Sequence, residues 1–316
     1  MKIALITPAR PVAHSGNRNT AVRWATLLRE LGHHVRVLTA WDDKPADVMI
    51  ALHARRSHDS IASFAAAFPR HPLIVMLTGT DLYRDIRGDP AAKFSLRLAT
   101  RLVVLQHEGL AELAPPFRRK TRVIYQSTHP IKKPPPLKSN FEVCISGHLR
   151  EVKDPFRLAA ALTHLPALSR IRAVQIGGAM SEPMKKEAQR WMRREPRYCW
   201  IGEVTHGRAL KRLARARLMV ISSRMEGGAN VVTEALAAGV PVIASRVSGN
   251  IGMLGKDYAG YFPFGNERAL ARLLSRAESD AEFYSRLQRQ CSARRGLTRR
   301  SREKNALRLL LQDVQT

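Results

Sequence analysis

Short apolar segments rich in β-branched residues recur almost from end to end of the chain, and helical segments separate them. The continuous apolar character of these segments is typical of strands in a parallel sheet that helices cover on both faces. The alternation therefore predicts an α/β fold built on doubly wound parallel sheets. In the first half of the chain the expected strands are 2–7, 34–39, 47–52, 73–78, 101–106 and 122–126.

The segment TAVRWATLLRELG predicts a helix between the first two strands, with Thr20 as its N-cap and Gly32 at its end. Residues 127–140 contain three consecutive prolines and three lysines, and such a segment cannot join a sheet. The alternation then restarts, with expected strands at 141–146, 171–177, 199–202, 217–222 and 241–245, and residues from about 267 onwards are expected to be helical.

The chain is thus expected to form two Rossmann-like domains that face a cleft. We predict an N-terminal domain at 1–130, a linker at 131–140 and a C-terminal domain at 141–316. The C-terminal helices of the second domain could return to the first. Ligands bind such sheets outside the carboxyl ends of the strands, so functional residues are expected in the loops that follow strands.

Composition narrows the function classes. The formal net charge of +27 favours binding to nucleic acid, to an anionic membrane or to a phosphorylated substrate. The alternative is that an arginine-rich composition alone accounts for the charge. An aromatic content of 6% and the absence of RNA-module signatures argue against nucleic acid. No apolar run approaches the length of a membrane span, no signal-peptide cleavage site follows the first strand, and the three cysteines are far apart, which together favour a cytoplasmic protein.

Two glutamates, Glu226 and Glu234, flank a segment of small residues after the expected strand 217–222. The glycines allow a close approach of backbone N–H groups to a ligand, and the start of the following helix favours an anion. A phosphate held there would have one carboxylate on each side, and carboxylates accept hydrogen bonds from sugar or ribose hydroxyls. The simpler alternative is that both glutamates are solvated charges at a helix terminus. The phosphate-contacting residues would be Gly228, Ala229, Asn230 and Val231.

This motif, followed by EALAAGVPVIAS, resembles the donor-binding signature of the family 4 glycosyltransferases, which have the GT-B fold. The segment 146–162 resembles the family's G-R-L-x-x-x-K motif, with Lys153 on its lysine. The N-terminal loop resembles the family's glycine loop, with Gly16 and Asn17 where two glycines are usual. The resemblance implies that Lys153 and Gly16 hold the donor diphosphate, that Glu226 contacts the transferred sugar and that Glu234 contacts the ribose.

The chain departs from the family pattern at two positions. His148 stands where the resemblance implies an arginine, and Arg150, two residues later, is the candidate replacement. Asn17 adds an amide beside the diphosphate or the acceptor. Negative charge develops on the leaving diphosphate during transfer, and a lysine, an arginine and a helix N-terminus would stabilise that charge without a metal. We therefore expect a metal-independent enzyme without a cofactor, with Lys153 and Glu226 as its catalytic residues.

A narrower resemblance concerns the run 228–263 together with LTGTDLYRD at 77–85. Both are similar to the bacterial selenosugar synthases of selenoneine biosynthesis, a subgroup of that family. This resemblance implies transfer of a sugar from UDP-N-acetylglucosamine or UDP-glucose to selenophosphate, with formation of a C–Se bond. The alternatives are a transferase acting on a hydroxyl of a lipid or saccharide, with peripheral membrane contact, a sugar-phosphate-isomerising enzyme and, less favoured, a nucleic-acid-binding module.

The expected acceptor side lies in the N-terminal domain. His53 and Thr80 follow strands and should face the cleft. Asp81 either positions the acceptor or caps the following helix. Arg18 and Asn19 offer further donors to a small anionic acceptor. The segment 202–207 is expected to meet the nucleobase through backbone groups, whereas the stereochemistry of transfer and the oligomeric state stay open.

Overall fold

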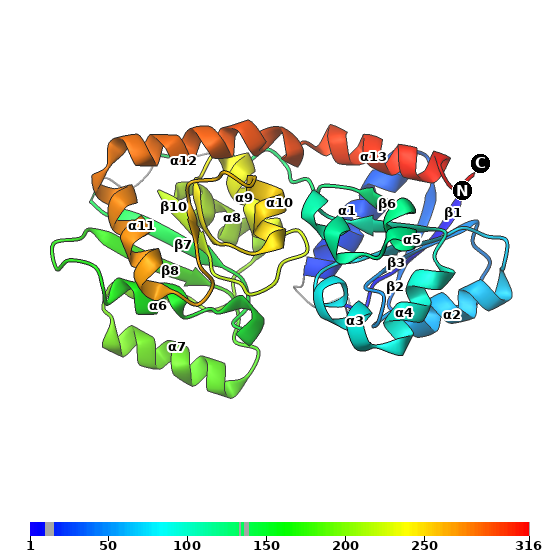
Figure 1. Cartoon of the computed structure of the whole chain (residues 1–316), viewed down its shortest axis with the longest axis horizontal. Helices are drawn as coiled ribbons and strands as arrows, with labels where there is room; N and C mark the ends of the chain where they lie inside the picture. Colours follow the sequence, from blue (N-terminus) through cyan, green and yellow to red (C-terminus); the bar gives the residue numbers. More distant parts are fainter. Residues whose placement is uncertain (10–15, 133, 136–138, 316) are drawn as a thin grey trace. The chain divides into compact units, whose positions relative to one another are not determined.

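The computed structural model describes residues 1–9, 16–132, 134–135 and 139–315. The chain forms two compact units (Figure 1). The first unit comprises Met1–Ser127 and Arg299–Thr316, and the second comprises Thr128–Thr298. Each unit is built on one six-stranded sheet whose strand pairs are all parallel, as the alternation of strands and helices predicts.

The sheet of the first unit has the order β2-β1-β3-β4-β5-β6. The chain runs from β1 to β2 on one side and then returns to place β3 on the other side of β1. The topological switch point of this sheet therefore lies between β1 and β3, where ligands bind in doubly wound sheets. Its strands are β1 (Lys2–Ile6), β2 (His34–Leu38), β3 (Val48–Leu52), β4 (Leu73–Met76), β5 (Arg101–Val104) and β6 (Thr121–Val123).

Side chains of the first sheet alternate between two buried apolar layers. Ile3 and Leu5 of β1 belong to one layer together with Trp24 of α1, whereas Ala4 and Ile6 belong to the other. This period of two is what a strand buried on both faces requires. The helices of this unit are α1 (Gly16–Glu30), α2 (His58–Ala67), α3 (Ile86–Gly88), α4 (Pro90–Leu98), α5 (Pro115–Arg119) and α13 (Arg300–Gln312), with a π-helical turn (Asp81–Asp85) and a 3₁₀ turn (His107–Glu112).

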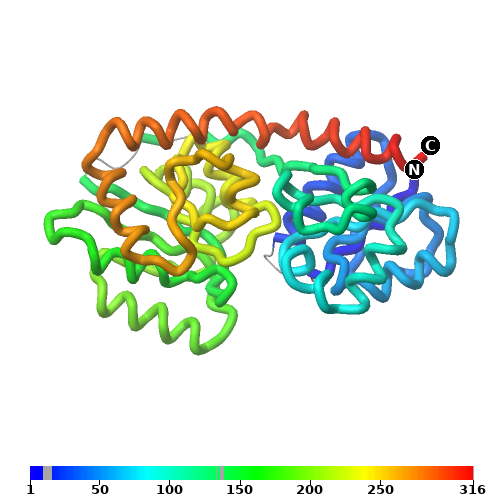
Figure 2. Tube along the Cα trace, in the orientation of Figure 1, coloured from blue at the N-terminus to red at the C-terminus, as the bar shows by residue number. Residues whose placement is uncertain are grey.

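The C-terminal helix α13 packs beside α1, and the two chain ends lie close together (Figure 2). The buried carboxylate of Glu303 on α13 accepts hydrogen bonds from Arg23 Nε at 3.0 Å, Trp24 Nε1 at 2.8 Å and the backbone N–H of Ser127 at 2.8 Å. A buried charge is tolerated because it is paired and hydrogen-bonded in this way. Glu303 therefore ties the end of the chain to α1 and to the segment after β6.

Helix α1 differs from the prediction at its start. It begins at Gly16, so Thr20 lies inside the helix, and its hydroxyl donates to the carbonyl of Gly16 at 2.9 Å instead of capping N–H groups. The prediction of Thr20 as the N-cap was wrong because the polar residues before it carry no apolar period. The predicted end is confirmed, since Gly32 follows the helix with a φ of +87°, a conformation that favours glycine.

The sheet of the second unit has the order β12-β11-β10-β7-β8-β9. The chain runs outward from β7 through β9 and then returns to place β10 on the other side of β7, so the switch point lies between β7 and β10. The sequence did not predict the edge strand β12, because its two residues, Tyr261–Phe262, are too few to show a strand period. The strands are β7 (Phe141–Ser146), β8 (Ile171–Ile176), β9 (Tyr198–Trp200), β10 (Leu218–Ile221), β11 (Val242–Ser245) and β12 (Tyr261–Phe262).

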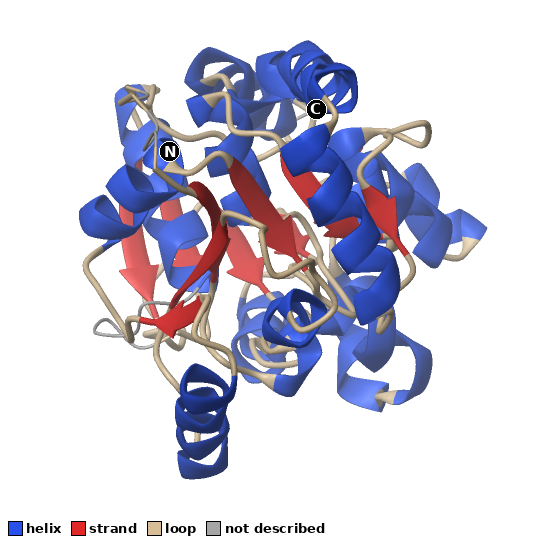
Figure 3. Cartoon of the chain, turned by 90° about the vertical axis from the view of Figure 1, so that its left-hand side faces the viewer, coloured by secondary structure: helices blue, strands red, loops and turns tan. Residues whose placement is uncertain are grey.

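Helices lie on both sides of the strands (Figure 3). In the part of the chain that the structure describes, none of the helices is long and apolar enough to cross a bilayer. The helices of the second unit are α6 (Arg157–Leu162), α7 (Glu182–Arg194), α8 (His206–Arg215), α9 (Asn230–Ala238), α10 (Ser248–Leu254), α11 (Glu267–Ser279) and α12 (Ala281–Arg294), with 3₁₀ turns at Glu151–Lys153 and Arg295–Thr298.

Candidate functional site

Two oppositely charged side chains meet at the switch point of the second sheet. Lys153 lies in the 3₁₀ turn after β7, and Glu226 lies in the loop after β10. Lys153 Nζ is 2.6 Å from Glu226 Oε1, and the side chains are 36% and 7% exposed. The structure thus joins two residues that are 73 positions apart in the sequence. Both were predicted to act in one site.

Backbone contacts hold the two loops together around this ion pair. Ser222 Oγ donates to the carbonyls of Lys153 at 3.1 Å and of Asp154 at 2.8 Å, and the N–H of Arg224 donates to the carbonyl of Val152 at 2.9 Å. Asp154 has a φ of +44°, which turns the chain sharply after Lys153. The position of Lys153 is therefore set by the fold, since three hydrogen bonds join its turn to the loop of Glu226. Neither Ser222 nor Arg224 belongs to a motif that the sequence reveals.

Glycine at position 249 allows α10 to approach the Glu226 loop. A Cβ atom added to Gly249 would lie 1.8 Å from the Glu226 carbonyl oxygen, a separation that no side chain can occupy. The adjacent Asn250 is buried and donates from Nδ2 to the Ser245 carbonyl at 2.9 Å. Ser245 Oγ in turn donates to the Ser223 carbonyl at 2.6 Å. These contacts connect α10, through Ser245, to the loop that carries Glu226. Apart from the glycine, no sequence pattern predicts these contacts.

Helix α9 begins directly after the Glu226 loop. Gly228 and Ala229 are buried, whereas Asn230 and Val231 at the start of the helix are half-buried. The first turn of α9 carries no acidic residue, so the positive end of the helix dipole is not offset from within the helix. The four predicted phosphate-contacting residues therefore lie where loop and helix meet, next to the ion pair.

Glu234 lies in the second turn of α9, and its side chain is 13% exposed. Glu234 Oε1 is 3.8 Å from His206 Nε2, and the His206 side chain is 57% exposed. His206 is the first residue of α8 and belongs to the segment 202–207 that was expected to meet a nucleobase. The structure thus places this segment beside Glu234.

The loops after β7, β8 and β9 also lie side by side. The N–H of Gly177 donates to the Gly202 carbonyl at 2.8 Å, and a Cβ added to Gly177 would lie 2.1 Å from the Gly147 oxygen. The Nδ1 atom of His148 accepts from the N–H of Gly178 at 3.2 Å. Arg150 is exposed and directly precedes the turn that contains Lys153. His148 thus joins one loop to another, while Arg150 lies three residues before Lys153.

In the first unit, α1 starts with Gly16, Asn17, Arg18 and Asn19. Asn17 and Arg18 are half-buried, Gly16 and Asn19 are exposed, and the first turn contains no acidic residue. The predicted glycine loop extends upstream into residues 10–15, which lie outside the described residues. The four predicted residues thus form one helix start after β1, at the switch-point edge of the first sheet.

The structure brings His53 and Thr80 together after β3 and β4. His53 Nε2 is 3.1 Å from Thr80 Oγ1. Asp81 is fully buried, and its carboxylate accepts backbone N–H groups from Ala54 at 3.0 Å, Thr78 at 3.0 Å and Gly79 at 2.9 Å. These amides belong to the two loops and precede the π-helical turn, so Asp81 does not cap that turn as one alternative predicted. It fixes the loops that carry His53 and Thr80.

A further carboxylate, Asp85, was not predicted. Its side chain is 4% exposed, and Oδ2 lies 4.0 Å from His53 Nε2 with no hydrogen-bond partner among the residues described. Its other oxygen accepts from Arg84 Nε at 2.9 Å. Burial lowers the pKa of His53 below its ordinary value of 6.5, and the neighbouring Asp81 opposes this effect. The backbone N–H of Arg56 donates to His53 Nδ1 at 3.3 Å, so neutral His53 carries its proton on Nε2 and donates from that atom.

Comparisons with known proteins agree with this geometry. A family model described as "Glycosyl transferases group 1" matches residues 128–294, more than half of the chain. "Glycosyltransferase 1 domain-containing protein 1" from Xenopus tropicalis is 24% identical in an alignment that covers 91% of this chain and 90% of the relative.

Solved structures show the same architecture. Anabaena HepE in complex with UDP and glucose has a TM-score of 0.78 at 17% identity, with 99% of both chains covered. Sucrose-phosphate synthase from Thermosynechococcus elongatus has a TM-score of 0.79 at 18% identity, with 99% of this chain and 98% of that chain covered. These likenesses confirm the predicted GT-B fold.

Proposed function

The chain belongs to the group 1 glycosyl transferases, and we propose that it transfers a sugar from UDP-N-acetylglucosamine or UDP-glucose to selenophosphate. The observation that carries the proposal is the ion pair between Lys153 and Glu226, 2.6 Å apart at the switch point of the second sheet. The ion pair lies beside the start of α9. The site therefore combines a cation, a helix N-terminus that can bind an anion, and a carboxylate that can accept hydrogen bonds from sugar hydroxyls.

The second unit is proposed to hold the donor. Lys153 and the N-terminus of α9, at residues 228–231, bind the diphosphate and stabilise the charge that develops when UDP leaves. Glu226 accepts hydrogen bonds from hydroxyls of the transferred sugar, and Glu234 accepts them from the ribose. Arg150 supplies a second cation near Lys153. These groups provide the charge stabilisation for which other transferases use a metal, so we propose a metal-independent reaction.

The first unit is proposed to hold the acceptor. Arg18 and Asn19 at the start of α1 supply donors for an anion, and His53 and Thr80 present a second polar pair after neighbouring strands. Gly16 and Asn17, at the same helix start, are proposed to contact the donor diphosphate. Asp81 acts as a positioning residue, because its oxygens accept loop amides.

The proposed step forms one bond and breaks one. A selenium lone pair of selenophosphate attacks the anomeric carbon, forming the C–Se bond. The bond from that carbon to the diphosphate oxygen breaks, and UDP leaves with the electron pair. Anionic selenium carries no proton that must be removed, so the step needs no general base on the protein.

Other observations support parts of this proposal. Anabaena HepE, which shares the fold, is described in complex with UDP-glucose, which favours UDP as the nucleotide. The cysteines Cys144, Cys199 and Cys291 are all free thiols, as expected of a cytoplasmic enzyme. The net charge of +27 favours a second candidate, transfer to a hydroxyl of a lipid or saccharide at an anionic membrane surface.

The test is UDP release from each UDP-sugar, measured with selenophosphate, with inorganic phosphate and with no acceptor. We expect release only with selenophosphate, accompanied by a selenium-bearing sugar in the mass spectrum and unaffected by EDTA. Binding of a UDP-sugar without selenophosphate-dependent release would overturn the acceptor assignment and direct the search to hydroxyl acceptors. Absence of any UDP-sugar binding would overturn the donor site itself.

A further inference from the structure

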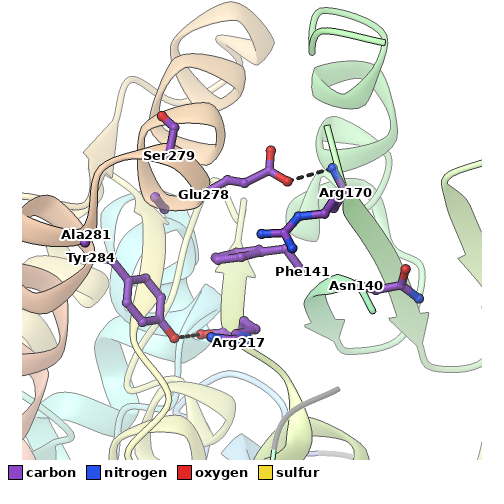
Figure 4. Close-up of a pocket in the computed structure, with 9 residues that line it drawn as sticks. Asn140, Phe141, Arg170, Arg217, Glu278, Ser279, Ala281 and Tyr284 are labelled. Carbon is purple, nitrogen blue, oxygen red and sulfur yellow. Dashed lines mark hydrogen bonds between the residues drawn. The ribbon is translucent and has the colours of Figure 1, made fainter. Parts of the chain in front are cut away.

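A cavity of about 210 Å³ lies at the amino ends of strands of the second sheet, whereas Lys153 and Glu226 follow carboxyl ends. Figure 4 shows the residues that line the cavity. Phe141 is the first residue of β7, Arg170 directly precedes β8 and Arg217 directly precedes β10, so the cavity lies at the amino ends of these strands. Residues from the end of α11 and the start of α12 close its other side. The lining residues are Asn140, Phe141, Arg170, Arg217, Ala277, Glu278, Ser279, Ala281 and Tyr284.

The charged residues that line the cavity are two arginines and one glutamate. Glu278 is held in place, because its carboxylate accepts from Ser169 Oγ at 2.7 Å and from the backbone N–H of Arg170 at 2.6 Å. The side chains of Arg170 and Arg217 take no part in these bonds. The cavity therefore has a formal charge of +1, and a ligand with a single negative charge would balance it.

Arg217 gives the strongest indication of a ligand. Its Nε atom is buried, and it has no hydrogen-bond partner among the described residues. A buried donor without a partner is costly, and the cost is larger for a charged group. The backbone carbonyl of Arg217 is already occupied, since Tyr284 donates its hydroxyl to it at 2.7 Å. Arg217 thus lines the cavity with a charged side chain whose Nε has no partner among the described residues.

The walls of the cavity suit a small organic molecule. The rings of Phe141 and Tyr284 pack edge to face with centroids 5.8 Å apart, and both line the cavity. A volume of about 210 Å³ has room for a charged group together with a compact apolar part.

We propose that this cavity binds a small monocarboxylate, with the carboxylate on the guanidinium of Arg217 and the apolar part against Phe141 and Tyr284. A planar carboxylate matches the planar fork of donors on an arginine. A phosphate monoester would bring two negative charges to a site with a formal charge of +1 that also holds Glu278. The site is separate from the donor site, and it does not depend on the proposed reaction.

The test is isothermal titration of benzoate, with benzamide as an uncharged molecule of the same shape and phenyl phosphate as a dianion. We expect benzoate to bind the unmodified protein and Arg217→Gln to weaken that binding by at least about tenfold. Benzamide should bind the unmodified protein no more tightly than benzoate binds the Arg217→Gln variant. Saturating UDP should not displace benzoate. Arg272→Gln, an exposed position on α11, is the matched control and should bind normally.

A second variant tests the location without removing charge. Ala281 is exposed and lines the cavity, so Ala281→Leu should fill it and abolish benzoate binding while the protein stays folded. The assignment is overturned if benzamide or phenyl phosphate binds as tightly as benzoate, or if UDP displaces benzoate. It is equally overturned if Arg217→Gln and Ala281→Leu, both shown to be folded by circular dichroism, bind benzoate like the unmodified protein.

Discussion

Lys153 is the residue whose removal tests the proposed chemistry most directly. Lys153→Met deletes the cation that would stabilise the leaving diphosphate, so we expect kcat to fall by roughly 10²–10³. Lys153→Arg keeps the charge and should retain part of the rate. Steady-state UDP release measures both, with the exposed Lys211→Met on α8 as control. If Lys153→Met changes only KM, the lysine serves binding and not the chemical step.

Replacement of Glu234, unlike that of Lys153, should weaken UDP binding without lowering kcat. It lies in the second turn of α9 beside His206 and is proposed to bind the ribose in ground state and transition state alike. Glu234→Gln should therefore weaken UDP binding by roughly tenfold and leave kcat nearly unchanged, since uniform binding does not lower the chemical barrier. Titration with UDP and saturation kinetics separate the two. A large loss of kcat would contradict this assignment.

His53 predicts a dependence of stability on pH. Burial lowers its pKa below 6.5, so between the lowered value and 6.5 the unfolded chain binds more protons than the folded one. The contribution of His53 to stability is therefore complete above about pH 6.5 and is lost as the pH falls through the lowered pKa. Asp81 and Asp85 limit this loss, and Arg56 adds to it.

The variant His53→Asn tests this effect, because asparagine tolerates the φ of +74° at this position. The free energy of unfolding of the variant, subtracted from that of the unmodified protein, should be smaller at about pH 5 than at about pH 7.5. Urea denaturation at the two pH values measures it. A difference that stays constant or grows on acidification would show that His53 is not the group that titrates.

At the scale of the element, the close approach of α10 to the Glu226 loop requires a residue without a Cβ atom at position 249. Gly249→Ala would place Cβ 1.8 Å from the Glu226 carbonyl oxygen, so the loop or the helix must move. We expect a loss of about 1–3 kcal/mol in the free energy of unfolding and weaker UDP-sugar binding. Thermal unfolding and titration with UDP measure the two effects.

Gly296, in the 3₁₀ turn Arg295–Thr298 of the same unit, is the control for this change. A Cβ added there meets no atom within 4 Å, so Gly296→Ala should be neutral or stabilising. If Gly249→Ala is tolerated as well as Gly296→Ala, then α10 does not set the position of Glu226. The comparison separates a close backbone approach from the general effect of replacing a glycine in a helical turn.

These elements show what sequence reasoning can and cannot reach. Long apolar runs predicted both sheets, and the resemblance of two motifs to those of the family 4 glycosyltransferases predicted that Lys153 and Glu226 act together. The strand Tyr261–Phe262 is too short to carry a period, and the start of α1 at Gly16 is polar, so both were missed. The contacts of Gly249 with the Glu226 loop and of Asp85 with His53 join segments distant in sequence, which no local pattern encodes.

At the scale of the whole molecule, the first unit is assembled from two stretches of chain that are separated by the entire second unit. Leu307, Leu310 and Leu311 of α13 belong to its core, in the same layer as Trp24. Folding of this unit must therefore close a loop of about 170 residues, an entropic cost that rises only slowly with length. Specific contacts of α13 have to offset that cost.

Glu303 makes the most numerous of these polar contacts, and its replacement tests them. Glu303→Gln leaves the Arg23 guanidinium without its charge partner at a side chain only 16% exposed, and we expect a loss of about 3 kcal/mol. For a unit of this size the midpoint of its thermal transition should fall by roughly 6–12 °C in calorimetry. Arg308→Gln, exposed on the same helix, should change the midpoint by little. UDP binding by the second unit should survive below the transition, because its core is separate. Equal midpoints for the two variants would mean that the apolar face of α13 alone holds the end of the chain in place.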